Sequence, residues 1–258
     1  MSGSRAGRMM AGLWQRRVLA RWHRRLRVAG DAPLSTLRDH MAEADSLRTV
    51  LDEYRATAGM RLARPRIGSD SFPLPAGTDW AWRPRSWRAP LEVGGLAGVV
   101  SQTRLGREVA VFHDCRDSAL TIRQQRNRGE GDLAPFALRL DILHFDGSFL
   151  SLALDLPEAA CTGLQRRHLL RLELGVACER PIEIFARLNV RHGPNVEQIV
   201  RELPAPSGRV VVEFDLAYTK LNEKRVELAW LDLIFDQPAM NEITIRDLVV
   251  ARYPRAEI

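Results

Sequence analysis

Cysteine is scarce in this sequence. Cys115, Cys161 and Cys178 are odd in number and form no CxxC pair, which argues against a disulfide framework and against a structural zinc site. None of the six histidines is paired at a metal-ligand spacing such as HxH or HxxxH. We therefore expect no metal and no cofactor. The cysteines are expected to be small buried apolar residues in a chain that folds in a reducing cytoplasm.

Catalytic motifs are also missing. The sequence has no GxSxG nucleophile elbow, no HExxH zinc-binding pair and no phosphate-binding P-loop. His113, Asp114 and Cys115 are adjacent, but neighbouring residues on a strand point to opposite faces, so adjacency creates no dyad. We therefore expect no catalytic residues and a protein that is not an enzyme. Two facing carboxylates on strands could hydrolyse a glycoside, so a glycan-processing enzyme stays open as an alternative.

Long apolar runs are absent as well. No stretch is long enough to cross a membrane as a helix, and the first thirty residues lack the apolar stretch of a secretory signal peptide. Those same residues contain eight arginines and no Asp or Glu, a charge of +8. The rest of the chain holds 30 basic and 32 acidic residues, so the basic character belongs to an N-terminal arm alone.

This arm has the periodicity of an amphipathic helix. Apolar side chains recur at every fourth residue and arginines fill the other side, which predicts a helix that ends near Gly30. Four roles stay open: packing on the chain's own body, docking into a groove of a partner protein, lying on an anionic membrane, or binding nucleic acid. A transit peptide has a similar composition. The apolar stripe consists of Met10, Trp14, Val18, Trp22 and Leu26.

A second helix and an irregular segment follow the arm. The helix is expected to begin at the caps Ser35 or Thr36 and to end at Gly59. Residues 63–95 contain five prolines and three closely spaced tryptophans, which predicts extended chain fastened across the next domain by its aromatic side chains. A tryptophan-lined ligand cleft is the alternative. The expected domains are a basic helical anchor or stalk (1–60), a Pro- and Trp-rich connector (61–95) and a β-domain (96–258).

From about Leu96 the period of apolar residues changes to two. About eleven short strands, beginning with GVVSQ at residues 98–102, are separated by turn-forming segments. Few helices interrupt them. The pattern predicts a mainly β protein, an antiparallel sandwich best fitted by a jelly roll, behind an N-terminal α-helical arm.

The stretch VELAWLDLIFDQP, residues 226–238, raises the question of a binding face. Alternation sets Trp230 and Asp232 on one side of this strand, opposite Ala229, Leu231 and Leu233. An aromatic plane with hydrogen-bonding groups beside it suits a sugar, whereas a core tryptophan beside cross-strand ion pairs is the structural alternative. Both interpretations stay open. The candidate carbohydrate-binding residues are Trp230, Asp232, Arg187, Asn189, Arg139 and Asp141.

The C-terminal half resembles a known family. The segments that carry the resemblance are FDGSFLSLALDLP, RHLLRLEL, RPIEIFARLNVRHGPNVEQIVREL and VEFDLAYTKLNEKRVELAWLDLIFDQPAMNEITIRDLVVARYPRAEI. Over roughly residues 135–258 they resemble an uncharacterised alphaproteobacterial jelly-roll domain family. That family is associated with the head-spike base protein of gene transfer agent particles, which are phage-like. The resemblance implies a jelly roll similar to carbohydrate-binding modules, and it carries no catalytic residues.

The resemblance also implies partners. A spike base would dock to the capsid protein at particle vertices and carry a spike fibre protein or touch host surface polysaccharide. It would lie on the particle surface after synthesis in the cytoplasm. A homo-oligomer is implied, with a pentamer favoured because capsid vertices are five-fold. No specific nucleic-acid partner is implied. A peripheral membrane protein held by the basic helix remains an alternative. The candidate capsid-docking residues are Met10, Trp14, Arg17, Val18, Arg21 and Trp22.

Overall fold

The computed structural model describes residues 5–62, 72–129, 131–204 and 208–255, without the side chains of residues 5–15, 53, 55–57 and 59–62. The chain divides into two compact units, Met1–Arg55 and Ala56–Ile258, and each is described by itself.

Two helices dominate the first unit. They are α1 (Arg5–Val28) and α2 (Leu34–Leu62), the second of which runs on into the other unit, and their ends lie close to the predicted ones. Arg21 and Arg25 of α1 form ion pairs with Glu43 of α2, at 2.6 and 2.7 Å. No helix among the described residues has both the length and the apolar content to span a membrane.

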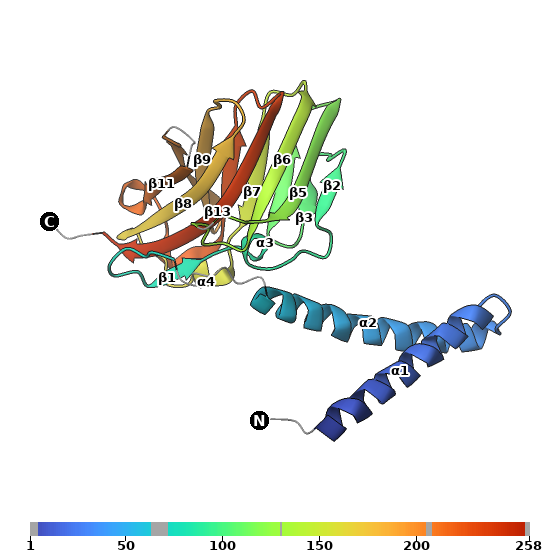
Figure 1. Cartoon of the computed structure of the whole chain (residues 1–258). Coiled ribbons are helices and arrows are strands. Elements are labelled where there is room, and N and C mark those ends of the chain that lie inside the picture. Colours follow the sequence, from blue (N-terminus) through green and yellow to red (C-terminus); the bar gives the residue numbers. More distant parts are fainter. Residues whose placement is uncertain (1–4, 63–71, 130, 205–207, 256–258) are drawn as a thin grey trace. The chain divides into compact units, whose positions relative to one another are not determined.

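The second unit is a jelly-roll sandwich of two antiparallel sheets (Figure 1). One sheet has the order β11-β8-β13-β6-β5-β2, with β1 paired to β13. Its strands are β1 (Trp80–Trp82), β2 (Gly95–Ala97), β5 (Ser118–Arg126), β6 (Phe136–Phe145), β8 (His168–Cys178), β11 (Gly208–Asp215) and β13 (Asn241–Pro254).

The opposite sheet has six strands in the order β10-β9-β12-β7-β4-β3. These strands are β3 (Thr103–Leu105), β4 (Val109–His113), β7 (Leu150–Asp155), β9 (Ile184–His192), β10 (Asn195–Glu202) and β12 (Val226–Phe235). The short helices of this unit are α3 (Arg85–Arg88), α4 (Glu158–Cys161), η1 (Leu216–Tyr218) and η2 (Glu223–Arg225).

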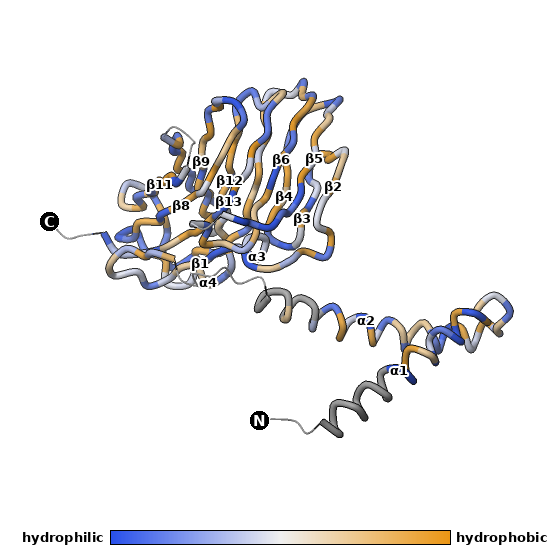
Figure 2. Tube along the Cα trace, viewed as in Figure 1, coloured by the Kyte–Doolittle hydropathy of each residue, from blue (hydrophilic) through white to orange (hydrophobic). Residues whose placement is uncertain are grey.

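Alternating hydrophobicity explains why these strands form a sandwich. Hydrophobic and hydrophilic residues alternate along many of the strands (Figure 2). In β12, Ala229, Leu231, Leu233 and Phe235 are each 1% exposed and lie between the sheets. A shift of one residue would turn this whole set towards water, so the core fixes which side chains of each strand face outward.

The expected strand at residues 98–102 is not present. The structure instead places β2 before this stretch and β3 after it, in different sheets. Gly98 and Gln102 have φ angles of 61° and 69°, which are incompatible with extended chain. The segment is therefore the crossing between the two layers.

The described part of the Pro- and Trp-rich segment belongs to the sandwich. β1 pairs with β13, and Trp87 on α3 is 0% exposed within the core. The indole N–H of Trp87 donates a hydrogen bond to the carbonyl oxygen of Ile245 at 2.9 Å. The guanidinium of Arg83 forms two hydrogen bonds with Asp247, both at 2.8 Å. The segment thus fastens itself to β13 by packing and by charge.

We predict that Trp87→Ala lowers the free energy of unfolding by about 3–5 kcal/mol, because it leaves a large cavity and an unpaired carbonyl. Urea denaturation followed by circular dichroism measures the loss. Leu143→Ala on β6 is the control, since Leu143 is 64% exposed and its truncation should change stability by less than about 0.5 kcal/mol. Equal effects of the two substitutions would contradict a core role for Trp87.

Candidate functional site

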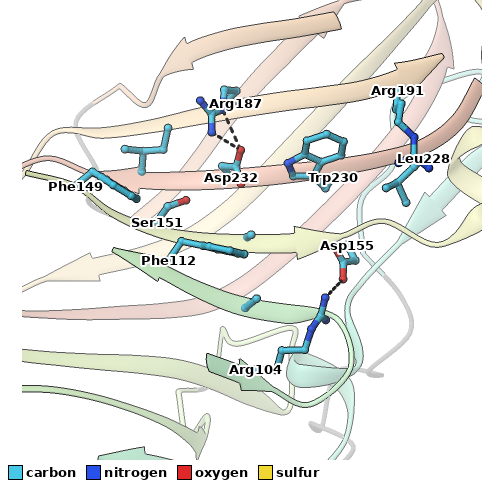
Figure 3. Close-up of a pocket in the computed structure, with 13 residues that line it drawn as sticks. Arg104, Phe112, Phe149, Ser151, Asp155, Arg187, Arg191, Leu228, Trp230 and Asp232 are labelled. Atoms are coloured by element: carbon cyan, nitrogen blue, oxygen red, sulfur yellow. Dashed lines mark hydrogen bonds and ion pairs between the residues drawn. The ribbon is translucent and has the colours of Figure 1, made fainter. Parts of the chain in front are cut away.

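A groove of about 690 Å³ lies on the outer face of the six-stranded sheet (Figure 3). This volume lies in the range of small-molecule and cofactor sites. Strands β3, β4, β7, β9 and β12 supply most of its lining. The lining residues are Arg104, Ala110, Phe112, Phe149, Ser151, Ala153, Asp155, Arg187, Arg191, Leu228, Trp230, Asp232 and Ile234.

Small side chains at paired positions form the floor of the groove. Ala110 on β4 is the cross-strand partner of Ala153 on β7, and Ser151 is the partner of Phe112. On the other side of β7, Ala153 is paired with Asp232 and Ser151 with Ile234 of β12. Because directly paired side chains stand next to each other, short ones leave a depression between larger neighbours.

Aromatic side chains form much of the rim. Trp230 is half-buried, Phe112 is 37% exposed and Phe149 is 40% exposed. Figure 3 shows the indole of Trp230 on β12, the ring of Phe112 on β4 across β7 from it, and the ring of Phe149 beyond Ser151. Exposed aromatic side chains gathered at one hollow of a folded surface are characteristic of a binding site.

Asp232 is a buried carboxylate, only 5% exposed, held by a hydrogen-bonded network. Its Oδ2 atom accepts from Nε and Nη2 of Arg187, both at 2.9 Å, and from Nδ2 of Asn189 at 2.8 Å. Asn189 is fully buried, and its Oδ1 atom accepts from Nε2 of Gln198 at 3.0 Å. The network offsets the cost of burying the charge and fixes the carboxylate's orientation.

Three polar atoms of the groove lack partners within the part of the chain that the structure describes. The hydroxyl of Ser151 is buried and makes no hydrogen bond. All hydrogen bonds to Asp232 reach Oδ2, so its Oδ1 atom accepts none. The indole N–H of Trp230 donates to no described residue. A buried hydroxyl without a partner is costly, and a ligand hydroxyl or a water would satisfy it.

The other charges at the groove occur as exposed ion pairs. Arg104 on β3 reaches Asp155 on β7 at 2.8 Å, with the two side chains 53% and 46% exposed. Arg191 on β9 reaches Glu227 on β12 at 3.2 Å, and these side chains are 48% and 47% exposed. The cations therefore face the groove with their charge already compensated.

Asp114 anchors the end of the groove at Phe149. Its carboxylate accepts hydrogen bonds from the hydroxyl and backbone N–H of Ser148 and from the N–H of Phe149. The hydrogen bond from the Ser148 hydroxyl, assisted by these amides, holds the pKa of Asp114 below its usual value. The β4–β5 loop thereby fixes Phe149, the residue directly before β7.

The candidate carbohydrate-binding residues fall into two groups. Arg187, Trp230 and Asp232 line the groove, and Asn189 lies behind Asp232. Arg139 and Asp141 do not join them, because both are on β6 in the opposite sheet. There they pair with each other at 2.7 Å, and Arg139 also pairs with Glu242 at 2.7 Å.

The core alternative for Trp230 is wrong, because Trp230 is half-buried on the outer face. The cross-strand ion pair it expected beside Trp230 is present, between Arg187 and Asp232.

Sequence reasoning missed the β4 and β7 side of the groove. Phe112 and Ala110 alternate with buried Val109 and Val111 in one strand. In the segment of residues 149–155, the outward-facing residues alternate with buried leucines. The period of two that placed Trp230 on the outer face could therefore have placed these residues there as well. The outward residues of that second segment are Phe149, Ser151, Ala153 and Asp155.

The candidate capsid-docking residues lie on α1. Trp22 contributes to a small hollow of about 380 Å³ between α1 and α2, and Arg25 stacks over its indole ring at 4.6 Å. Arg21 pairs with Glu43, Arg17 is exposed and Val18 is half-buried. The side chains of Met10 and Trp14 lie outside the described residues.

Among the residues that the structure describes, no cluster of three or more His, Cys, Asp or Glu side chains is suitable for a metal ion. The groove contains two carboxylates, Asp155 and Asp232, and each is paired with an arginine. Their arrangement can orient hydroxyl groups by hydrogen bonding.

Comparison with known proteins gives a family match and several likenesses of fold. Residues 1–258 match the model of DUF6478, described as a family of unknown function. No curated protein matches the chain in sequence.

Solved structures similar in fold include the enzymatically active domain of tailspike protein 4 of bacteriophage CBA120, at 5% identity and a TM-score of 0.40. That match covers 56% of this chain and 19% of the tailspike chain. A family 11 carbohydrate-binding module of Clostridium thermocellum, in complex with a mixed-linked tetrasaccharide, is 8% identical with a TM-score of 0.38, covering 64% and 99%. A family 61 module in complex with β-1,4-galactotriose is 13% identical with a TM-score of 0.32, covering 57% and 88%.

We predict that Arg187→Met lowers the free energy of unfolding by about 3 kcal/mol, because it leaves the buried Asp232 carboxylate without its counter-charge. Arg191→Met on the same strand is the matched control. It breaks only the exposed pair with Glu227 and should cost less than about 1 kcal/mol. Chemical denaturation of both variants measures the difference, and equal losses would contradict a buried, paired Asp232.

Proposed function

We propose, for a chain that belongs along its whole length to the DUF6478 family of unknown function, that the sandwich binds glycans at the groove on its six-stranded sheet. Binding without catalysis is the proposed activity. The observation that carries the proposal is the combination, in one hollow, of a half-buried tryptophan and a buried hydroxyl without a hydrogen-bond partner.

The groove offers both kinds of contact that sugars need. A pyranose ring has an apolar C–H face that packs against an aromatic plane, and Trp230 presents such a plane beside the alanine and serine floor. A sugar also carries hydroxyl groups that both donate and accept. The unpaired Asp232 Oδ1, Ser151 hydroxyl and Trp230 N–H supply acceptors and donors for them.

Preorganisation supports binding as well. Asp232 is held by Arg187 and Asn189 before any ligand arrives, so a ligand would not have to order it. Binding without turnover is favoured because each groove carboxylate is already occupied by an arginine, whereas glycoside hydrolysis needs one proton-donating acid and one free carboxylate.

As the biological role, we propose that the protein is a head-spike base on the surface of a phage-like gene transfer agent particle, where its sandwich binds glycans. The support is the resemblance of roughly residues 135–258 to the family associated with those spikes. An acid-free arm with eight arginines in residues 1–30 would then attach the protein to the capsid vertex. The proposed ligand is host surface polysaccharide.

We predict that Trp230→Ala weakens glycan binding by at least about tenfold, because the stacking plane is lost, while the midpoint of urea unfolding stays close to that of the wild type. Affinity gel electrophoresis against a polysaccharide panel measures binding. Tyr218→Ala is the control, since Tyr218 is 81% exposed and lies outside the groove. Glycan binding that is unchanged in Trp230→Ala, or that weakens equally in both variants, would contradict the proposal that the groove is the glycan site.

We also predict that removing residues 1–30 strips the protein from particles purified from the native host. Immunoblotting of the particle fraction against the lysate measures retention, and circular dichroism of the shortened protein checks that the sandwich is folded. If a folded, shortened protein remains on the particles, or if no particle carries the full chain, the proposed anchoring is wrong.

A further inference from the structure

We infer that the groove selects neutral glycans and discriminates against glycans that carry uronic acids. This inference rests on the proposed function and adds the chemical class of the ligand. It follows from how the charges at the groove are compensated.

Every arginine that faces the groove has a carboxylate partner. Arg187 pairs with the buried Asp232. The other two pairs are exposed and flank the site: Arg104 with Asp155 at 2.8 Å, and Arg191 with Glu227 at 3.2 Å. Counting Glu227, which does not line the groove but pairs with Arg191 beside it, three cations and three anions leave the site without net charge.

An anionic sugar would meet an unfavourable environment there. Its carboxylate would have to share a guanidinium with the resident carboxylate, and it would then lie beside that negative charge. Asp232 adds a further cost. Its carboxylate is only 5% exposed, and two negative charges close together repel most strongly where water is excluded.

A neutral sugar meets no such cost. The atoms without partners at the floor and rim are a hydroxyl, an indole N–H and one carboxylate oxygen, on Ser151, Trp230 and Asp232. Hydroxyl groups satisfy all three, because they donate to the oxygen atoms and accept from the N–H. The polar complementarity of the groove is therefore to hydroxyl groups.

The exposure of the two flanking pairs makes this inference testable by gain of function. Asp155 and Glu227 are each nearly half exposed, so neutralising them leaves the fold intact. The double variant Asp155→Asn/Glu227→Gln frees Arg104 and Arg191 and adds two positive charges to the groove. We expect it to bind alginate or polygalacturonate about tenfold more tightly than the wild type does, with an affinity that falls as salt rises.

The matched control places the same charge change on the opposite sheet. Asp141→Asn/Glu242→Gln removes the partners of Arg139, which pair with it at 2.7 Å on β6 and β13. This control should bind acidic polysaccharides like the wild type, because Arg139 and Arg123, the arginines that lose a carboxylate partner, both lie outside the groove. Affinity electrophoresis of the full chain and both variants uses a β-glucan, a galactan, a mannan, alginate and polygalacturonate.

The outcomes separate this inference from the function on which it rests. Wild-type binding to a neutral polysaccharide, with a gain for acidic ones only in the groove variant, supports the inference. Wild-type binding to alginate or polygalacturonate as tight as to any neutral polysaccharide overturns it and leaves glycan binding standing. An equal gain in both variants, or none in the groove variant, also overturns it. A folded wild type that binds no polysaccharide overturns the proposed function as well.

Discussion

The requirement that each strand of the six-stranded sheet bury every second side chain determines the rest of this structure. In β12 the buried residues Leu231 and Leu233 fix the register, and the register leaves Trp230 and Asp232 outside. The same requirement acts on β4 and β7, where buried valines and leucines leave short side chains facing outward. The core thus fixes which side chains face the hollow, and the size of those side chains sets its depth.

Alternation along a strand was enough to predict the fold class and the faces of β9 and β12. It could not say which strands are neighbours, because pairing depends on contacts between distant parts of the chain. For this reason Arg139 and Asp141, which have the residue types of a binding face, were grouped with Trp230 although they lie on the other sheet. The contribution of Ala153 and Ser151 was missed because small residues stand out only when their larger neighbours are known.

Backbone conformation accounts for the missing strand at residues 98–102. These residues have the composition of a strand, yet Gln102 has a positive φ, which a non-glycine residue rarely adopts. Trp87 agrees with the expectation that aromatic side chains fasten the proline-rich segment across the next domain, since it is one of the largest fully buried side chains of the core.

The alanine and serine floor has a consequence for how this protein can change over generations. Ala110, Ser151 and Ala153 face away from the hydrophobic core, so their size sets the depth of the hollow without affecting the packing between the sheets. A single substitution at any of them would reshape the site while the scaffold keeps its stability. For the glycan site proposed above, ligand preference can therefore diverge among descendants of one fold while the fold itself is retained.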